Sequence, residues 1–251
     1  MVTTLRGSDI TTYSDANGNT ITGTPITNNN AVIEFMGSNC HVTFDDTFTL
    51  HGKISFRRDN GTVRMGRRSS FRGLMSLGLD CSVTFGDSVY CGLNLQITTA
   101  EATSVTLGND LLIANNCVIR SDDSHPIYDG VTGNRINPSA SITVMDHVWL
   151  GQESLLMPGA RIGKGSVIGA RSMVTKSRPV PAHCIAIGAP ARVQRTKIKW
   201  TRKHLQVSDD IPDSIPSVFS ADDVRPARAA HTVRRRPVRR WARSFLGALR
   251  S

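Results

Sequence analysis

Histidine is the side chain best suited to moving a proton near neutral pH, and His125 has the most suggestive context in this sequence. It follows Asp122 and Asp123 in the run SDDSHP, so a turn could present its imidazole beside a carboxylate. Such a group can take a proton from a hydroxyl, whereas a satisfied surface histidine in a turn is the alternative interpretation. No two histidines are fewer than ten residues apart, so a closely spaced histidine pair is missing and we expect no metal site.

The elements that must position His125 are indicated by a period of six residues, which is typical of a stacked solenoid. From residue 144 onward a large aliphatic residue recurs every six positions, and a small or apolar residue stands four positions after each of the first five. The same period, with slips, extends toward the N-terminus. The aliphatic positions are Val144, Leu150, Leu156, Ile162, Ile168 and Val174; their companions are Val148, Ser154, Ala160, Ser166 and Ser172; the earlier positions are Phe44, Leu50, Phe56, Met65, Phe71, Leu77, Phe85, Cys91, Ile97, Leu107, Ile113 and Ile119.

Three such hexads make one triangular coil, so the sequence predicts an all-β fold, a parallel β-helix. We expect three stacked pairs from this period, the members of each pair being separated by three hexads. An antiparallel β-sandwich is the alternative, but its strands alternate with period two and have no reason to keep period six. The interruption at 98–106 is expected to bulge outward as a loop. The expected pairs are Val144 with Ile162, Leu150 with Ile168, and Leu156 with Val174.

The repeat is also interrupted around His125. Continuing the period would turn this residue inward, but Asp123 occupies the companion position and Pro126 follows. A polar inward site and a proline both end a ladder strand. We therefore expect residues 120–140 to form an extended loop that presents His125, together with Asp122 or Asp123, to a neighbouring surface.

Four segments of the chain resemble one family of enzymes. The stretches VWLGQESLLMPGARIGKGSVIGARSMVTK and AIGAPARVQR, with YCGLNLQITT and ANNCVIRSDDSHPIYD upstream, are similar to hexapeptide-repeat acyltransferases, in particular the galactoside, maltose and xenobiotic O-acetyltransferases. The similarity covers about residues 83–200. It implies a left-handed coil, acetyl-CoA as acyl donor, a saccharide hydroxyl as acceptor, and a homotrimer with active sites between subunits. The acceptor would be a polysaccharide or its lipid-linked precursor.

The same resemblance assigns roles to individual residues. His125 matches the general base that deprotonates the acceptor hydroxyl. Asn94 matches a residue that contacts the acceptor sugar, and Trp149 an aromatic near both acceptor and thioester. Asp122 and Asp123 would accompany them on the acceptor side. The positions that match coenzyme-binding residues are Trp149, Gly151, Ala170, Thr175, Lys176, Arg192 and Arg195.

Several of these residues have a second interpretation. Asn94 fits a corner of the coil as well as a ligand contact. Trp149 stands between two inward positions, so its ring should point outward, where it could plug a subunit interface as well as form a substrate platform. Lys176 and the two arginines on the acyltransferase-like C-terminal stretch could be solvated surface charges, although phosphates give them a better use.

Composition restricts the partners and the compartment. The chain has 251 residues and a formal net charge of +10, but residues 225–251 alone carry nine Arg and no acid. The charges of the preceding part of the chain are nearly balanced, which argues against specific nucleic-acid binding. Five cysteines without a CxxC pair, no apolar secretory start and no apolar run of membrane-spanning length favour a cytoplasmic protein.

The expected organisation has three parts. Residues 1–30 would form an N-terminal cap, and residues 31–200 the β-helix with its loop. Residues 201–251 would form a linker and a basic tail, after a short helix that starts within 196–206. In the tail, apolar residues stand at roughly helical spacing among arginines, as on a membrane-surface helix; they are Trp241, Phe245, Leu246 and Leu249. The tail could therefore hold the protein at an anionic membrane, peripheral to its inner face. A disordered solvated tail is the alternative, with RNA binding a weaker third.

The leading hypothesis is therefore an acetyl-CoA-dependent O-acetyltransferase acting on a saccharide. Two enzymatic alternatives are an N-acyltransferase for a nucleotide-sugar amine and an acetyltransferase for an antibiotic hydroxyl. A non-catalytic β-helix serving as an assembly scaffold is the alternative from a different class.

Overall fold

The inward-facing residues of this chain are gathered into three sheets. The computed structural model describes residues 2–205. Sheet A contains β1 (Thr3–Arg6), β4 (Val32–Phe35), β6 (Thr49–Phe56), β8 (Ser70–Leu77), β11 (Leu95–Thr99), β14 (Val118–Arg120), β17 (Leu155–Leu156) and β20 (Met173–Val174). Sheet B contains β2 (Tyr13–Ser14), β3 (Thr20–Thr22), β5 (His41–Phe44), β7 (Thr62–Met65), β9 (Ser82–Phe85), β12 (Ser104–Leu107), β15 (Ile142–Val144) and β18 (Arg161–Ile162). Sheet C contains β10 (Tyr90–Cys91), β13 (Leu112–Ile113), β16 (Trp149–Leu150), β19 (Val167–Ile168), β21 (Cys184–Gly188) and β22 (Ala191–Thr196).

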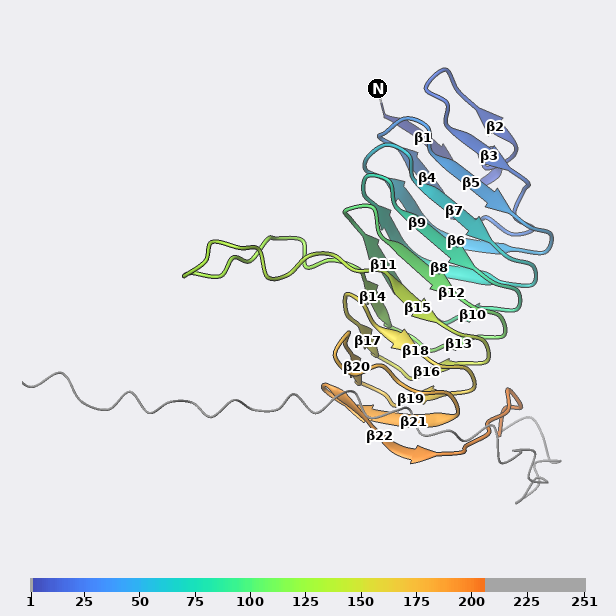
Figure 1. Cartoon of the computed structure of the whole chain (residues 1–251). Coiled ribbons are helices and arrows are strands. Elements are labelled where there is room, and N and C mark those ends of the chain that lie inside the picture. Colours follow the sequence, from blue (N-terminus) through green and yellow to red (C-terminus); the bar gives the residue numbers. More distant parts are fainter. Residues whose placement is uncertain (1, 206–251) are drawn as a thin grey trace, which may run out of the picture. The chain divides into compact units, whose positions relative to one another are not determined.

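From β8 to β20 the chain visits the sheets in the fixed order A, B, C, so the described residues form a three-sided parallel solenoid of about eight turns (Figure 1). We name the edges of this prism by the sheets they join: edge A–B, edge B–C and edge C–A. A short 3₁₀ helix, Gly7–Asp9, follows β1. The all-β parallel β-helix expected from the period of six is confirmed.

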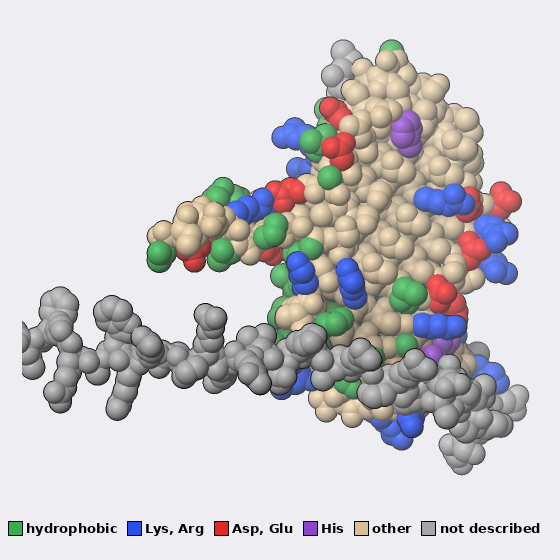
Figure 2. All heavy atoms as spheres, viewed as in Figure 1, with side chains coloured by type: hydrophobic (Ala, Val, Ile, Leu, Met, Phe, Trp, Pro, Cys, Tyr) green, Lys and Arg blue, Asp and Glu red, His purple; other side chains and the backbone are tan. Residues whose placement is uncertain are grey.

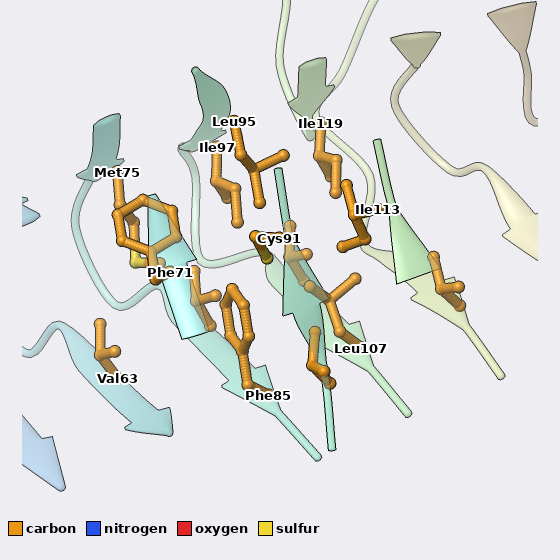
Figure 3. Packing of buried hydrophobic residues seen from close by; sticks show 14 of the residues in the cluster. Val63, Phe71, Met75, Phe85, Cys91, Leu95, Ile97, Leu107, Ile113 and Ile119 are labelled. Atoms are coloured by element: carbon orange, nitrogen blue, oxygen red, sulfur yellow. The ribbon is translucent and has the colours of Figure 1, made fainter. Parts of the chain in front are cut away.

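The register agrees with the sequence pattern residue by residue. Val144 pairs with Ile162, Leu150 with Ile168, and Leu156 with Val174, as expected for coils of three hexads. Every expected inward aliphatic or aromatic position, including the less regular early ones, is at most 5% exposed. Figure 3 shows how such side chains from successive coils meet inside the prism, where the rings of Phe71 and Phe85 pack edge to face with centroids 6.0 Å apart. Burial of these stacked rows is the main term that stabilises the coil.

The slips in the early repeat have a geometric cause. Val42 pairs with Val63, Val63 with Val83, and Val83 with Val105, so each of these coils is longer than three hexads. The expected loop at 98–106 is wrong in extent, because β11 continues to Thr99 and β12 begins at Ser104, which leaves only a short turn.

The long strands β6 and β8 bend at Gly52 and Gly73, which pair with each other. Their φ angles are +120° and +154°. A Cβ atom on Gly52 would lie 2.0 Å from the Gly73 carbonyl oxygen, and one on Gly73 would lie 1.9 Å from that of Leu95. Only glycine allows the backbones of successive coils to approach so closely at this bend.

Antiparallel strands stand at both ends of the stack. β1 pairs with β4 and β2 with β3 at the N-terminal end, while β22 pairs with β21 at the other end. β3 lies within residues 1–30, the segment expected to be a cap, and it already pairs in parallel with β5. The short helix expected from 196 is wrong for residues 197–205, which are irregular. The Ile198 backbone N–H donates to the His183 carbonyl oxygen and the Trp200 carbonyl oxygen contacts the His147 ring, so both groups bond to coil corners and not within a helix. The basic tail lies outside the described residues.

All five cysteines are buried and free. Burial raises the pKa of the Cys91 thiol, because desolvation disfavours its thiolate. Among the described residues, no helix has the length and apolar character needed to cross a bilayer.

Candidate active site

The loop that carries His125 leaves the solenoid at edge A–B, between β14 and β15 (Figure 1). The extended loop expected from the interrupted repeat is thus confirmed. His125 is exposed, and its backbone N–H donates to the carbonyl oxygen of Asp123 at 2.8 Å. Its imidazole forms no hydrogen bond with a residue of the described part of the chain. The ring is therefore free to meet a group that comes from outside its own loop.

The two acidic residues before His125 organise the loop backbone. Asp122 is 8% exposed, and its Oδ1 accepts a hydrogen bond from the backbone N–H of Ser124 at 2.9 Å. Asp123 accepts from the side-chain amide of Asn137 at 3.1 Å. Both carboxylates are thus used in shaping the turn that carries the imidazole.

Asn137 joins the two limbs of the loop. Its amide nitrogen donates to Asp123 and, at 2.9 Å, to the carbonyl oxygen of His125. Its amide oxygen accepts from the backbone N–H of Ile127 at 2.6 Å. One side chain therefore fixes the residues on both sides of His125.

A second brace holds the base of the loop to the coil above. Glu101 accepts hydrogen bonds from the Arg135 guanidinium, from the Ser139 hydroxyl at 2.5 Å and from the Ser139 backbone N–H at 3.1 Å. These donors, Arg135 above all, lower the pKa of the Glu101 carboxyl to about 2. The returning limb of the loop is thereby tied to edge A–B.

Asn94 lies on a different edge. It follows β10 at edge C–A with φ of +59°, and its amide donates to the Asn116 side chain at 3.1 Å in the next coil. It is thus a corner residue. It also lines a depression of about 740 Å³, together with His51, Arg72 and Gln96. Both interpretations of Asn94 from the sequence remain compatible with this position.

Trp149 is outward-facing in β16 and 39% exposed, as expected. Its ring lies 6.0 Å from that of Trp200, which stacks on His147 at 4.1 Å. The Trp200 indole N–H donates to the His147 carbonyl oxygen. Asp110 contacts both His147, at 2.5 Å, and Arg202, at 2.8 Å. The segment after β22 is therefore fastened across edge B–C and places a second indole beside Trp149.

The expected coenzyme residues lie in the last coils but on two edges. Gly151 and Ala170 follow β16 and β19 at edge C–A, and a Cβ on Gly151 would come within 2.7 Å of the Ala170 nitrogen. Thr175 and Lys176 follow β20 at edge A–B, where the Lys176 stem covers Gly159. The remaining two, Arg192 and Arg195, are exposed on β22.

Within one chain, then, the structure does not bring all the expected site residues together. His125, Thr175 and Lys176 share edge A–B, whereas Asn94, Gly151 and Ala170 share edge C–A. Sheet A lies between these two edges. No group of three His, Cys, Asp or Glu side chains within residues 2–205 is arranged to hold a metal ion.

Comparison with known proteins gives a consistent picture. No model of a protein family matches the sequence. The polysialic acid O-acetyltransferase of Escherichia coli O1:K1 / APEC is 32% identical over 150 residues, which are 59% of this chain and 48% of that protein. The galactoside O-acetyltransferase of Escherichia coli (strain K12) is 35% identical over 130 residues, 50% of this chain and 62% of that protein. The chain thus spans about half to three fifths of the length of these curated relatives.

The crystal structure of the polySia specific acetyltransferase NeuO shares 31% identity and a TM-score of 0.69 with this chain, covering 74% of this chain and 86% of that one. The chain belongs to the hexapeptide-repeat acyltransferase family. The left-handed form of the coil, which the resemblance implied, is confirmed with it.

The sequence pattern did not indicate the residues that brace the loop and flank Trp149. Asn137 and Glu101 fix the loop, and Trp200 flanks Trp149, but none of them belongs to the repeat. The one available signal was the dipeptide of Asn137 and Pro138, which is typical of a turn and marks where the loop returns to the coil.

Proposed function

We propose that the chain transfers an acetyl group from acetyl-CoA to a hydroxyl of a saccharide, with His125 as the general base. The observation that carries this proposal is an exposed imidazole, held by a doubly braced loop at an edge of a hexapeptide-repeat coil. The names of two relatives, a polysialic acid and a galactoside O-acetyltransferase, support a saccharide acceptor.

The chemistry assigned to His125 follows from its surroundings. An alcohol is a weak nucleophile at neutral pH, and an imidazole can take its proton as the oxygen attacks a carbonyl. The bond from the hydroxyl oxygen to the acyl carbon forms, the carbon–sulfur bond breaks, and the proton on the imidazole goes to the departing sulfur. Asp122, Asp123 and Asn137 hold the loop backbone, so His125 keeps its direction during the transfer.

Acetyl-CoA supplies the acetyl group as a thioester, and three cations of the last coils fit its phosphates. Lys176, Arg192 and Arg195 are exposed and form no salt bridge with a residue in the described range 2–205. Exposed cations without a carboxylate partner are common partners of phosphate oxygens. Gly151 and Ala170 add a corner with little side-chain bulk, along which an extended ligand arm can lie.

The division of the site between two edges supports assembly from copies of this chain. On sheet A the outward residues Leu74, Val118, Leu155 and Met173 lie in one row and are apolar apart from Gln96 between the first two. Hydrophobic side chains also line the projecting loop (Figure 2), with Val131 95% exposed. We propose a trimer in which sheet A faces a neighbour, so that the loop of one copy reaches edge C–A of the next.

Release of the coenzyme thiol from acetyl-CoA, measured with a panel of oligosaccharides, tests the proposed activity. We expect His125→Ala to lower kcat by about 10²- to 10⁴-fold, the usual contribution of a general base. His41→Ala, a matched change at the far end of the coil, should leave the rate unchanged. Absence of turnover with every acceptor, together with identical behaviour of His125→Ala, would favour the scaffold instead.

Complementation tests the shared site. Co-expression of His125→Ala and Asn94→Ala chains should restore activity that neither variant has alone, because a mixed trimer pairs an intact loop with an intact edge C–A. Absence of any recovery in trimers shown by mass to be mixed would reject the shared site without affecting the assignment of His125.

A further inference from the structure

The early coils carry a groove that the proposed acetyl transfer does not explain. The depression lined by Asn94 adjoins a second one of about 360 Å³, and Arg72 lines both. Arg68, Thr49 and Tyr90 line the second depression. The two depressions therefore meet at Arg72, and together they are called the groove below.

The groove is cationic. Neither set of lining residues includes an Asp or a Glu, whereas both include arginine and the first also includes His51. His51 and Arg72 are register partners on β6 and β8, so their side chains project from neighbouring coils. The nearby Arg67, by contrast, is neutralised by Asp87 at 2.7 Å. The charge of the groove is thus left without a counter-ion among the lining residues that the structure describes.

Arg72 is the least satisfied of these groups. Its Nε atom is buried and has no hydrogen-bond partner within residues 2–205, and the residue forms no salt bridge there. A buried cationic donor without a partner is unfavourable, so such a group is expected to receive its partner from a ligand. A guanidinium presents a planar pair of donors that matches a carboxylate.

The other lining residues fit a sugar. Asn94, Asn116 and Gln96 provide amide donors and acceptors for hydroxyl groups, and Thr49 adds a hydroxyl. Tyr90 and Leu93 are exposed to 47% and 54% and offer apolar surface for the faces of sugar rings. Tyr90 also stands in the outward column of sheet C that continues through Leu112 to Trp149.

We propose that this groove is a subsite for a carboxylate-bearing saccharide, in which Arg72, assisted by His51, binds the carboxylate and Asn94 lies at the end nearer the site of transfer. The inference rests on the proposed function, since it names the class of acceptor. Arg72 would determine specificity for an acidic chain and take no part in the chemistry of transfer.

The test measures binding without acetyl-CoA, in the His125→Ala background, by isothermal titration at low salt. The probes are a sialic acid tetrasaccharide, the same compound with its carboxylates methyl-esterified, and a neutral galactose tetrasaccharide. The acid should bind about tenfold or more tightly than its ester, because hydrogen bonds from a guanidinium to a charged carboxylate are stronger than those to a neutral ester. Arg72→Gln should abolish that difference. Arg64 is exposed, pairs with Asp45 and lies on sheet B, away from Arg72 on sheet A, so Arg64→Gln should preserve the difference.

Arg72→Lys keeps the charge without the planar donor pair and should retain only part of the preference, which provides a second measurement if Arg72→Gln does not fold. Equal binding of acid and ester by the parent chain, or an unchanged preference in Arg72→Gln, would overturn the subsite. Since no acetyl transfer is involved, failure of the proposed activity leaves these binding results interpretable. Conversely, acetyl transfer to neutral sugars alone would reject the carboxylate subsite and support the proposed activity.

Discussion

Replacing Asn137 by alanine tests whether the loop must be held rigid for transfer. The substitution removes the two donations to Asp123 and to the His125 carbonyl oxygen, the acceptance from the Ile127 backbone N–H, and a longer acceptance from the Arg135 Nε at 3.5 Å. The three shorter contacts lie beside His125 and none lies in the coil interior. The expected effect is therefore local.

The size of the effect follows from these three contacts. Each hydrogen bond contributes about 0.5–1.5 kcal/mol, and the partial exposure of this loop places the total near the lower end, about 2 kcal/mol. A change of that size shifts the ratio of closed to open loop by roughly 30-fold. We expect kcat/KM to fall by about 10- to 30-fold, while the melting temperature of the coil changes by less than about 3 °C.

The assay combines kinetics with amide exchange. Asn137→Ala should accelerate exchange at Ile127 and lower kcat/KM together. Asn134→Ala is the matched control. It removes an amide side chain from the same loop, and that side chain forms no hydrogen bond with a described residue. If Asn137→Ala keeps kcat/KM within about twofold of the parent and leaves Ile127 protected, the brace has no role in catalysis and the reasoning fails.

Two further predictions concern the loop base and the core. The pKa of Glu101 is about 2, below its ordinary 4.5, so the contribution of this carboxylate to stability is present above pH 4.5 and is lost only as the pH falls toward 2. Protection of the Ser139 amide, normalised for intrinsic exchange, should therefore persist at pH 4, and Glu101→Gln should lower that protection at pH 7. Leu156→Ala removes a fully buried side chain and should lower the free energy of unfolding by about 2–5 kcal/mol in denaturant melts. A loss no larger than that caused by Leu79→Ala, a change at an exposed residue, would contradict the register.

The sequence pattern predicted the coil interior well because a period of six reports which residues face inward. It specified pairs such as Val144 with Ile162, and it showed where the chain must leave the coil near His125. The greater length of the early coils could not be derived in the same way. Two of these coils carry glycines at positive φ, Gly52 and Gly73, and the period does not encode such positions.

The candidate site was less predictable, since its residues lie on edges and loops. Trp200 meets His147 over a separation of 53 residues, and Arg135 meets Glu101 over 34. Such contacts depend on the path of an irregular segment through space, and no repeat constrains that path. The unpartnered Nε of Arg72 is likewise visible only once its neighbours are placed.

The antiparallel strands at the ends of the stack limit its growth. A parallel coil with open ends is a template on which another copy could add turns and polymerise into a filament. Here β1 and β2 reverse direction on sheets A and B at one end, and β22 reverses direction on sheet C at the other, so an added turn would meet a strand of opposite polarity on these sheets and could not continue the inward rows. The number of turns is thereby set by the chain, and copies are left to associate side by side.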